Sequence, residues 1–121
     1  MITVTHAFVI DDEEIVRTSL GKLLRVVGIP STLFGSAEAF LASYRGDERG
    51  CLIVDIRMPG MSGLDLLEAL QARGCTLPAI VISGHADEGS LQRLARLQTV
   101  GLLEKPFSLA QLKDMLARCG G

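Results

Sequence analysis

Residues 51–63 read CLIVDIRMPGMSG, and this stretch decides the fold. It opens with four apolar residues and places Asp55 directly after them. A strand that is apolar throughout, without alternation, is typical of a parallel sheet that is covered on both faces. A proline and two glycines then mark a loop. The stretch therefore predicts a buried parallel strand that delivers a carboxylate to a loop at its carboxyl end.

The same unit, an apolar run followed by helical apolar spacing, recurs along the chain. The first helical stretch places Val16, Leu20, Leu23, Leu24 and Val27 on one face. Strands are expected at 5–10, 31–34, 51–54, 79–82 and 100–103, and helices at 14–27, 36–43, 64–73, 87–98 and from 108 onward. Alternation of strands and helices predicts an α/β domain with right-handed crossovers and helices on both faces of the sheet.

Composition limits what the chain can be. Its 121 residues fit one domain, and 48% of them are hydrophobic, which is enough to build a core. The net charge is −2, Trp is absent and aromatic residues make up 4%, so direct binding of nucleic acid is not expected. No apolar run approaches the roughly 20 residues that a membrane span requires, and no targeting segment is visible. The three cysteines form no CxxC pair, which favours reduced thiols that pack in a cytoplasmic protein.

Polar side chains follow four of the expected strands. Asp11 and Asp12 end the first, Asp55 the third, Ser83 the fourth and Lys105 the fifth. The carboxyl ends of parallel strands form one functional edge of the sheet, so these groups are expected to converge. Two carboxylates ~4 Å apart repel by about 4 kcal/mol at an effective dielectric near 20. A hard divalent cation such as Mg²⁺ relieves that repulsion, and the lack of a His/Cys cluster argues against zinc.

A set of carboxylates with a lysine, a serine and a bound Mg²⁺ is suited to phosphoryl transfer. A carboxylate is a competent nucleophile toward phosphorus, and the reaction needs positioning and charge neutralisation more than acid–base help. Mg²⁺ and Lys105 would neutralise the phosphoryl oxygens, while Ser83 would donate a hydrogen bond. The product would be an aspartyl phosphate. No residue in the set is suited to act as a dedicated base for rapid hydrolysis, which fits a phosphate that persists as a signal.

Four separated motifs together resemble the response-regulator receiver domain of two-component signalling. They are Asp11-Asp12, residues 54–63, Ser83-Gly84 and residues 105–107. The resemblance covers essentially the whole chain, residues 1–121, and is to receivers often joined to a helix-turn-helix output domain. It implies a single doubly wound, flavodoxin-like (βα)5 domain with sheet order 2-1-3-4-5. The chain is then either the N-terminal part of a longer regulator or a stand-alone receiver.

The resemblance also implies roles by position. Asp55 matches the phospho-acceptor, and Asp12, assisted by Asp11, matches the acid pair that holds Mg²⁺. The backbone carbonyl of Arg57 matches the main-chain metal ligand. Ser83 matches the switch hydroxyl.

Lys105 matches the phosphate-sensing lysine, and its bond to Pro106 is typically cis in the family. The side chains of Arg57 and His85, each two residues after a site residue, are expected near the pocket mouth.

The implied function is a switch and not an enzyme beyond self-catalysed phosphoryl transfer and slow autodephosphorylation. A sensor histidine kinase would phosphorylate Asp55. The surface of the fourth helix, fifth strand and fifth helix would then change and control an output domain or partner protein, with transcription as the expected readout. The resemblance also allows a phosphorylation-dependent homodimer.

Several alternatives stay open at the level of sequence. Leu102 stands three residues before Lys105, where the family usually has Tyr or Phe, and this departure keeps a phosphate-independent interaction module in view. A phosphatase with an aspartyl-phosphate intermediate and a flavin-binding relative are weaker rivals. Asp11 or Asp12 alone could be a helix N-cap, as is expected of Asp87. The leucines at 91, 94 and 97 span too wide an arc for one buried stripe, so part of the set is expected to face outward.

Overall fold

The computed structural model describes residues 2–97, 99 and 101–119, and the apolar runs form one five-stranded sheet. Its strands are β1 (Ala7–Ile10), β2 (Ser31–Phe34), β3 (Cys51–Asp55), β4 (Ala79–Ser83) and β5 (Gly101–Glu104). The order is β2-β1-β3-β4-β5 and every neighbouring pair is parallel, as predicted. The stretch that decides the fold thus becomes the central strand, with Asp55 as its last residue.

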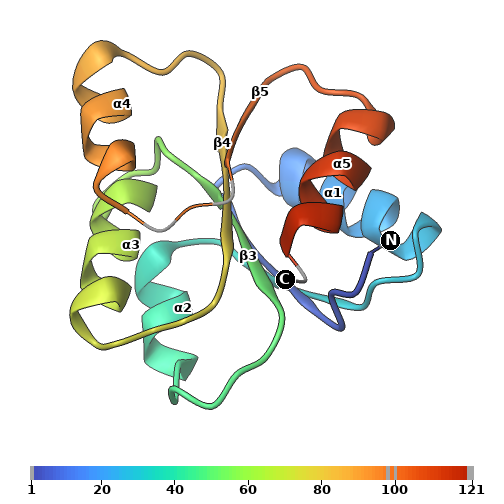
Figure 1. Cartoon of the computed structure of the whole chain (residues 1–121), viewed down its shortest axis with the longest axis horizontal. Helices are drawn as coiled ribbons and strands as arrows, with labels where there is room; N and C mark the ends of the chain where they lie inside the picture. Colours follow the sequence, from blue (N-terminus) through green and yellow to red (C-terminus); the bar gives the residue numbers. More distant parts are fainter. Residues whose placement is uncertain (1, 98, 100, 120–121) are drawn as a thin grey trace.

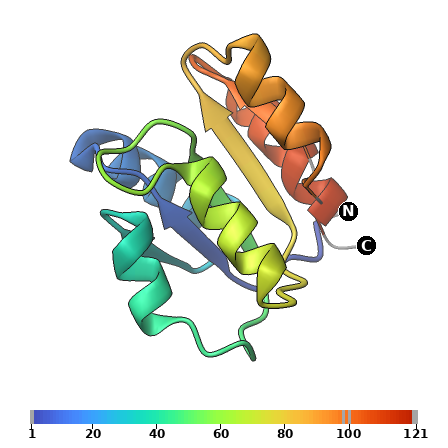
Figure 2. The same cartoon turned by 90° about the vertical axis from the view of Figure 1, so that its left-hand side faces the viewer.

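The helices cover both faces of this sheet (Figures 1 and 2). They are α1 (Glu14–Val26), α2 (Ala37–Ser43), α3 (Gly63–Ala72), α4 (Glu88–Ala95) and α5 (Leu109–Cys119). In Figure 1, α1 and α5 lie on one side of the strands, and α2, α3 and α4 lie on the other. The architecture is therefore the doubly wound α/β sandwich that alternating strands and helices predict.

Two apolar clusters, one on each face, hold the layers together. Every residue of β3 is buried, and its side chains alternate between the clusters. Leu52 and Val54 pack with α2, α3 and α4, whereas Cys51 and Ile53 pack with α1 and α5. Because both faces are covered, the strand needs apolar residues at every position, which explains the unbroken run in the sequence.

Side-chain caps begin four of the five helices. Ser36, Asp87 and Ser108 each accept a hydrogen bond from the backbone N–H three residues later, as expected of N-caps. Ser62 does the same for α3 and forms a reciprocal capping box with Asp65.

The helix α1 is the exception. Its N-cap is Glu13, which makes no side-chain cap bond. The alternative in which Asp11 or Asp12 caps this helix is therefore wrong, and both carboxylates need another explanation.

Several element boundaries differ from the predicted ones. β1 begins at Ala7 and not at Thr5, because its partners on both sides, Ser31 and Cys51, pair with Ala7. α4 ends at Ala95, where Arg96 and Leu97 turn with i−3 bonds to α4 carbonyls. The predicted end of that helix at residue 98 and the predicted start of the last strand at residue 100 lie outside the described residues. In the part of the chain that is described, every helix is too short or too polar to cross a bilayer.

Candidate functional site

Buried polar side chains gather at one edge of the sheet. Across the described residues the buried polar or charged side chains are Asp11, Asp55 and Ser83, with exposed fractions of 1%, 5% and 1%. Asp11 follows β1, Asp55 ends β3 and Ser83 ends β4. Since β1, β3 and β4 are adjacent and parallel, their carboxyl ends bring these residues together. Burial of polar groups is costly, so this edge is built for a purpose other than packing.

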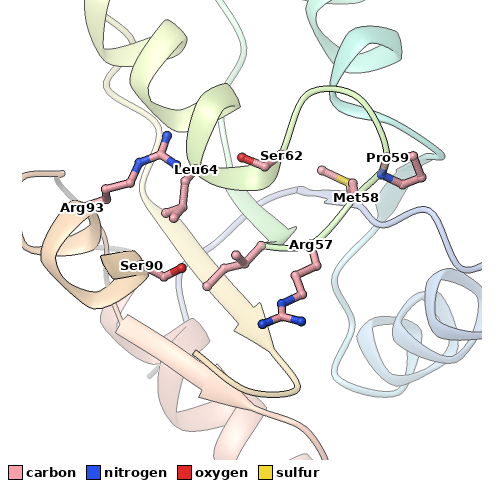
Figure 3. A pocket seen from close by; sticks show the side chains of 8 residues that line it. Arg57, Met58, Pro59, Ser62, Leu64, Ser90 and Arg93 are labelled. Carbon is pink, nitrogen blue, oxygen red and sulfur yellow. The ribbon is translucent and has the colours of Figure 1, made fainter. Parts of the chain in front are cut away.

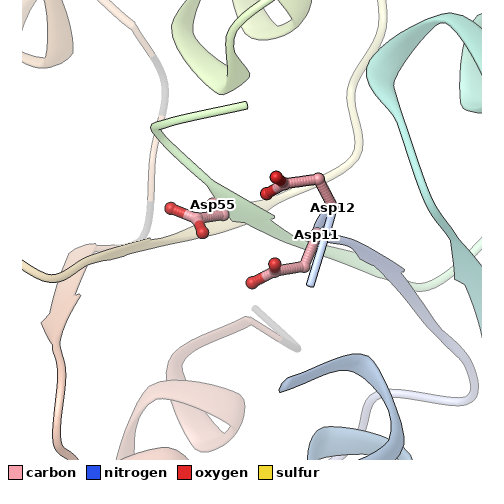
Figure 4. A group of neighbouring side chains, drawn as sticks. All are labelled: Asp11, Asp12 and Asp55. Atoms are coloured by element: carbon pink, nitrogen blue, oxygen red, sulfur yellow. The ribbon is translucent and has the colours of Figure 1, made fainter. Parts of the chain in front are cut away.

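The carboxylates form a cluster that could hold a metal ion (Figure 4). Asp11, Asp12 and Asp55 each offer an oxygen, and these atoms all lie within 4.8 Å of one another. Asp12 is exposed while the other two are buried, so the cluster opens to solvent on one side. Oδ2 of Asp11 is buried and has no hydrogen-bond partner among the described residues. An oxygen-only donor set with an unsatisfied buried oxygen fits a hard cation such as Mg²⁺.

The protonation of Asp11 reflects this crowding. Burial raises the pKa of its carboxyl to about 6, and the charge of Asp55 acts in the same direction. The Glu13 N–H, which donates to Asp11 Oδ1 over 2.9 Å, and the charge of Lys105 oppose the rise. The site is therefore short of positive charge.

Lys105 brings an ammonium group into the cluster. Its Nζ lies 3.1 Å from Asp55 Oδ2 and 3.7 Å from Asp11 Oδ2, and 3.9 Å from Glu13 Oε1. Burial opposes the charge of Lys105, but its hydrogen bond to Asp55 and the surrounding acids outweigh that penalty, so its pKa is raised. The bond to Pro106 is cis, as the resemblance implies. Glu13 was not predicted as part of the site. Its position directly after Asp11-Asp12 is the sequence feature that could have identified it.

Ser83 lies beside the acid cluster without taking part in it. Its Oγ is buried and has no hydrogen-bond partner among the described residues. Its backbone carbonyl accepts the N–H of Lys105 over 2.8 Å, so the two residues are joined through the main chain. A buried hydroxyl without a partner carries an energetic cost, and a ligand oxygen at the site would remove it.

Three hydrogen bonds hold the loop after β3 in place. Arg57 N donates to Asp55 Oδ1 over 3.2 Å, and Gly63 N donates to the Ile56 carbonyl over 3.0 Å. Met61 N donates to Oε2 of Glu38, on α2, over 3.3 Å. This loop carries the Arg57 carbonyl, the predicted main-chain ligand. Neither the hydrogen bond to Glu38 nor the hydrogen bond from Gly63 to Ile56 was predicted, because both depend on how α2 and α3 pack.

Arg17 fastens the loop after β1. Its Nη1 donates to the backbone carbonyl of Asp11 over 2.8 Å. The same guanidinium lies against Gly35, where an added Cβ would sit 3.4 Å from Nη1. A side chain on α1 thereby holds the main chain that carries Asp11 and Asp12, and this contact was also not predicted.

Arg57 and His85 are exposed and lie near Asp87. The hydrogen bonds with Ser90 lower the pKa of the Asp87 carboxyl most, and the charges of Arg57 and His85 add to this. A groove of about 470 Å³ lies beside Arg57, between the β3–α3 loop and α4, with Ser62 and Arg93 on its walls (Figure 3). That both side chains influence a bound phosphoryl group stays a prediction.

The leucines at 91, 94 and 97 divide as expected. Leu94 is buried, Leu97 is partly buried, and Leu91 is 47% exposed. Leu102, paired with Val81, is half-buried and packs against the same cluster as Leu94 and Leu97. It therefore occupies the α4 side of β5.

Comparison with known proteins identifies a family that matches most of the chain. Residues 7–117 match the family model of the response regulator receiver domain. The transcriptional regulatory protein FixJ of Bradyrhizobium diazoefficiens is 39% identical over 96% of this chain and 57% of its own length. FixJ of Azorhizobium caulinodans is 44% identical over 86% of this chain and 49% of its own length.

Solved structures give the same result. The crystal structure of FixJ-N is 36% identical, covers 95% of this chain and 92% of its own, and superposes with a TM-score of 0.87. The chain spans about half the length of the curated relatives it matches. Fold, motif positions and sequence identity lead to one conclusion: the chain belongs to the family of response regulator receiver domains.

Proposed function

We propose that this receiver domain takes a phosphoryl group from a sensor histidine kinase onto Asp55, with Mg²⁺ bound at the acid cluster. The observation that carries the proposal is the position of Asp55. Its carboxylate is buried in a cluster with two other acids, yet Oδ2 is 3.1 Å from the Lys105 ammonium. This environment surrounds the carboxylate with groups that can neutralise phosphoryl oxygens.

The proposed metal ligands are Asp11, Asp12, Asp55 and the backbone carbonyl of Arg57. The unsatisfied Oδ2 of Asp11 supports this assignment, because a cation would compensate it. Mg²⁺, when bound, would neutralise charge on the carboxylates and on the incoming phosphoryl group.

Each remaining side chain has a separate task in the transfer. A carboxylate oxygen of Asp55 forms the new P–O bond while the P–N bond of the donor phosphohistidine breaks, and the imidazole takes up a proton. Lys105 is already hydrogen-bonded to Asp55 and can pair with a phosphoryl oxygen. Ser83 has a hydroxyl with no partner among the described residues and can donate to another. These groups bind and orient the phosphoryl group, and none of them serves as a base for its hydrolysis.

The proposed signal leaves through α4, β5 and α5. Ser83 and Lys105 are connected by a backbone hydrogen bond, so displacement of one residue would also displace the other. The matched relatives are transcriptional regulators of about twice this length, which supports control of an output domain and of transcription. A partner protein or a second phosphorylated copy could read the same surface.

Incubation with acetyl phosphate and Mg²⁺, followed by intact-mass measurement, tests the proposal. We expect a gain of one phosphoryl group that is absent from D55N and absent when Mg²⁺ is chelated. A folded protein that gains no mass would overturn it and favour the phosphate-independent interaction module, with Leu102 as the first residue to study.

A further inference from the structure

An arginine of α4 is hydrogen-bonded to two carboxylates of α3. Arg93 Nη2 donates to Asp65 Oδ1 over 2.8 Å, and Arg93 Nε donates to Glu68 Oε2 over 3.1 Å. The same Nη2 also donates to the second oxygen of Glu68. In Figure 3 the Arg93 guanidinium extends from α4 toward α3. These bonds join two helices that are separate in the sequence, so the position of α4 is tied to that of α3.

Asp65 also belongs to the cap of α3. Its Oδ2 accepts the backbone N–H of Ser62 over 3.1 Å, and its own N–H donates to Ser62 Oγ over 3.1 Å. One carboxylate therefore binds the N-cap of α3 through one oxygen and the arginine of α4 through the other. A displacement of Arg93 would act on the residue at which the loop after β3 becomes a helix.

The start of α3 lies directly against the proposed phospho-acceptor. A Cβ added at Gly63, the first residue of α3, would sit 2.1 Å from the backbone oxygen of Asp55. The Gly63 N–H donates to the Ile56 carbonyl over 3.0 Å, which closes the loop that carries the Arg57 carbonyl. Because Gly63 and Asp55 are packed without a gap, the start of α3 cannot shift unless Asp55 or this loop shifts with it.

We propose that Arg93 is a positioning residue for phosphoryl transfer at Asp55, acting through Asp65 and the first turn of α3. The inference rests on the proposed function, because it concerns the site that would receive the phosphoryl group. Coupling between two positions is reciprocal, so occupancy of the Asp55 site should also change α4. This connection lies on the α3 side of α4 and involves neither Ser83 nor Lys105.

The bridge is suited to fixing an orientation and contributes little to overall stability. The side chains of Arg93, Asp65 and Glu68 are 39%, 48% and 46% exposed, and exposed ion pairs stabilise a fold only weakly. A guanidinium, however, presents its donors in a rigid planar fork, and here the fork contacts two carboxylates. We therefore expect the loss of Arg93 to affect phosphoryl transfer more than unfolding.

Labelling of the full chain with acetyl phosphate, followed by intact-mass measurement, tests this role. In R93Q we expect several-fold slower labelling at saturating Mg²⁺, with a urea midpoint close to that of the native chain. R93K can still pair with one carboxylate and should recover part of the rate. R118Q removes the exposed ion pair with Asp114 on α5 and is the matched control, which should be labelled at the native rate.

A double-mutant cycle separates an effect through the cap from a general tethering of the two helices. In D65N the amide oxygen can still accept the Ser62 N–H, but the charge that pairs with Arg93 is lost. D65N should slow labelling as R93Q does, and D65N/R93Q should be no slower than either single variant. E68Q keeps the contact between Arg93 and Asp65 and should be labelled faster than D65N. A native rate in R93Q, or multiplied effects of D65N and R93Q, would overturn the inference.

Amide hydrogen exchange in α4 gives the reciprocal measurement and distinguishes this inference from the proposed function. In the native chain, labelling or Mg²⁺ alone should change exchange in α4, and R93Q should reduce that change. A native chain that gains no phosphoryl mass would reject the proposed transfer, while Mg²⁺ alone would still test the connection between Asp55 and α4. Exchange that responds equally in both chains, or in neither, would overturn the inference.

Discussion

Lys105 Nζ lies 3.1 Å from Asp55 Oδ2, although the two residues are fifty positions apart in the chain. The same ammonium lies 3.7 Å from the buried Asp11 carboxylate. One ammonium group therefore lies beside two buried carboxyl groups at the carboxyl edge of the sheet. The stability of the metal-free protein should depend on this arrangement.

Replacement of Lys105 by methionine should destabilise the metal-free protein. The substitution keeps the length of the side chain but leaves Asp11 and Asp55 without their cation. Because Lys105 is itself partly exposed, we expect a loss of about 1–2 kcal/mol and not the larger cost of breaking a fully buried pair. Urea unfolding in EDTA measures it, with K113M on the surface of α5 as the control. Equal midpoints for the two variants would contradict the prediction.

Asp11 should make stability depend on pH when Mg²⁺ is absent. Its pKa is raised from 3.8 to about 6, so the native state holds this proton more tightly than the unfolded chain does. The stability that the folded protein gains from binding this proton is fully present below about pH 4 and is lost as pH rises through about 6. At neutral pH the ionised Asp11 is therefore unfavourable by roughly 3 kcal/mol.

D11N should remove that penalty. In EDTA, the unfolding free energy of D11N should exceed that of the native chain by an amount that grows as pH rises from 5 to 8. Mg²⁺ should cancel this difference, because it should stabilise the native chain and not D11N. Urea unfolding at each pH provides the comparison. A difference between the two proteins that does not change with pH would show that Asp11 is not a source of strain.

Gly63 should tolerate no side chain. A Cβ at this position would lie 2.1 Å from the backbone oxygen of Asp55 and 2.8 Å from Val54 Cγ1. G63A must push α3 away from the end of β3, and we expect a loss of about 1–3 kcal/mol together with slower phosphoryl uptake. G84A is the matched control, because nothing lies within 4 Å of its added Cβ. Thermal unfolding and acetyl phosphate labelling measure the two effects.

Arg17 should act on the metal site through the main chain. R17A removes the 2.8 Å hydrogen bond to the Asp11 carbonyl and frees the loop that carries two of the proposed ligands. We expect several-fold more Mg²⁺ to be needed for half-maximal labelling by acetyl phosphate, with a smaller change at saturating Mg²⁺.

Two further variants separate this role from general stability. R17K can still donate to the carbonyl and should recover part of the Mg²⁺ dependence. R25A removes an exposed arginine of the same helix and should behave as the native chain does. If R17A and R25A required the same Mg²⁺ concentration, Arg17 would have no positioning role.

Local chemistry in the sequence was sufficient for much of the fold. The apolar run before Asp55 predicted a strand buried on both faces, and β3 is buried at every position. Asp87 was predicted as a helix cap because capping uses a side chain and a backbone group three residues apart. The convergence of the strand-end residues also followed from sequence, since parallel strands share their carboxyl edge.

Contacts between elements were decided only by tertiary structure. Glu13 beside Lys105, Arg17 on the Asp11 carbonyl and Glu38 on the β3–α3 loop depend on how helices pack against strand ends. Sequence periodicity reports which face of an element is buried, and it carries no information on which residue of another element that face will meet. The chain's own sequence thus determined the strand-end chemistry, and packing determined the side chains that hold it in place.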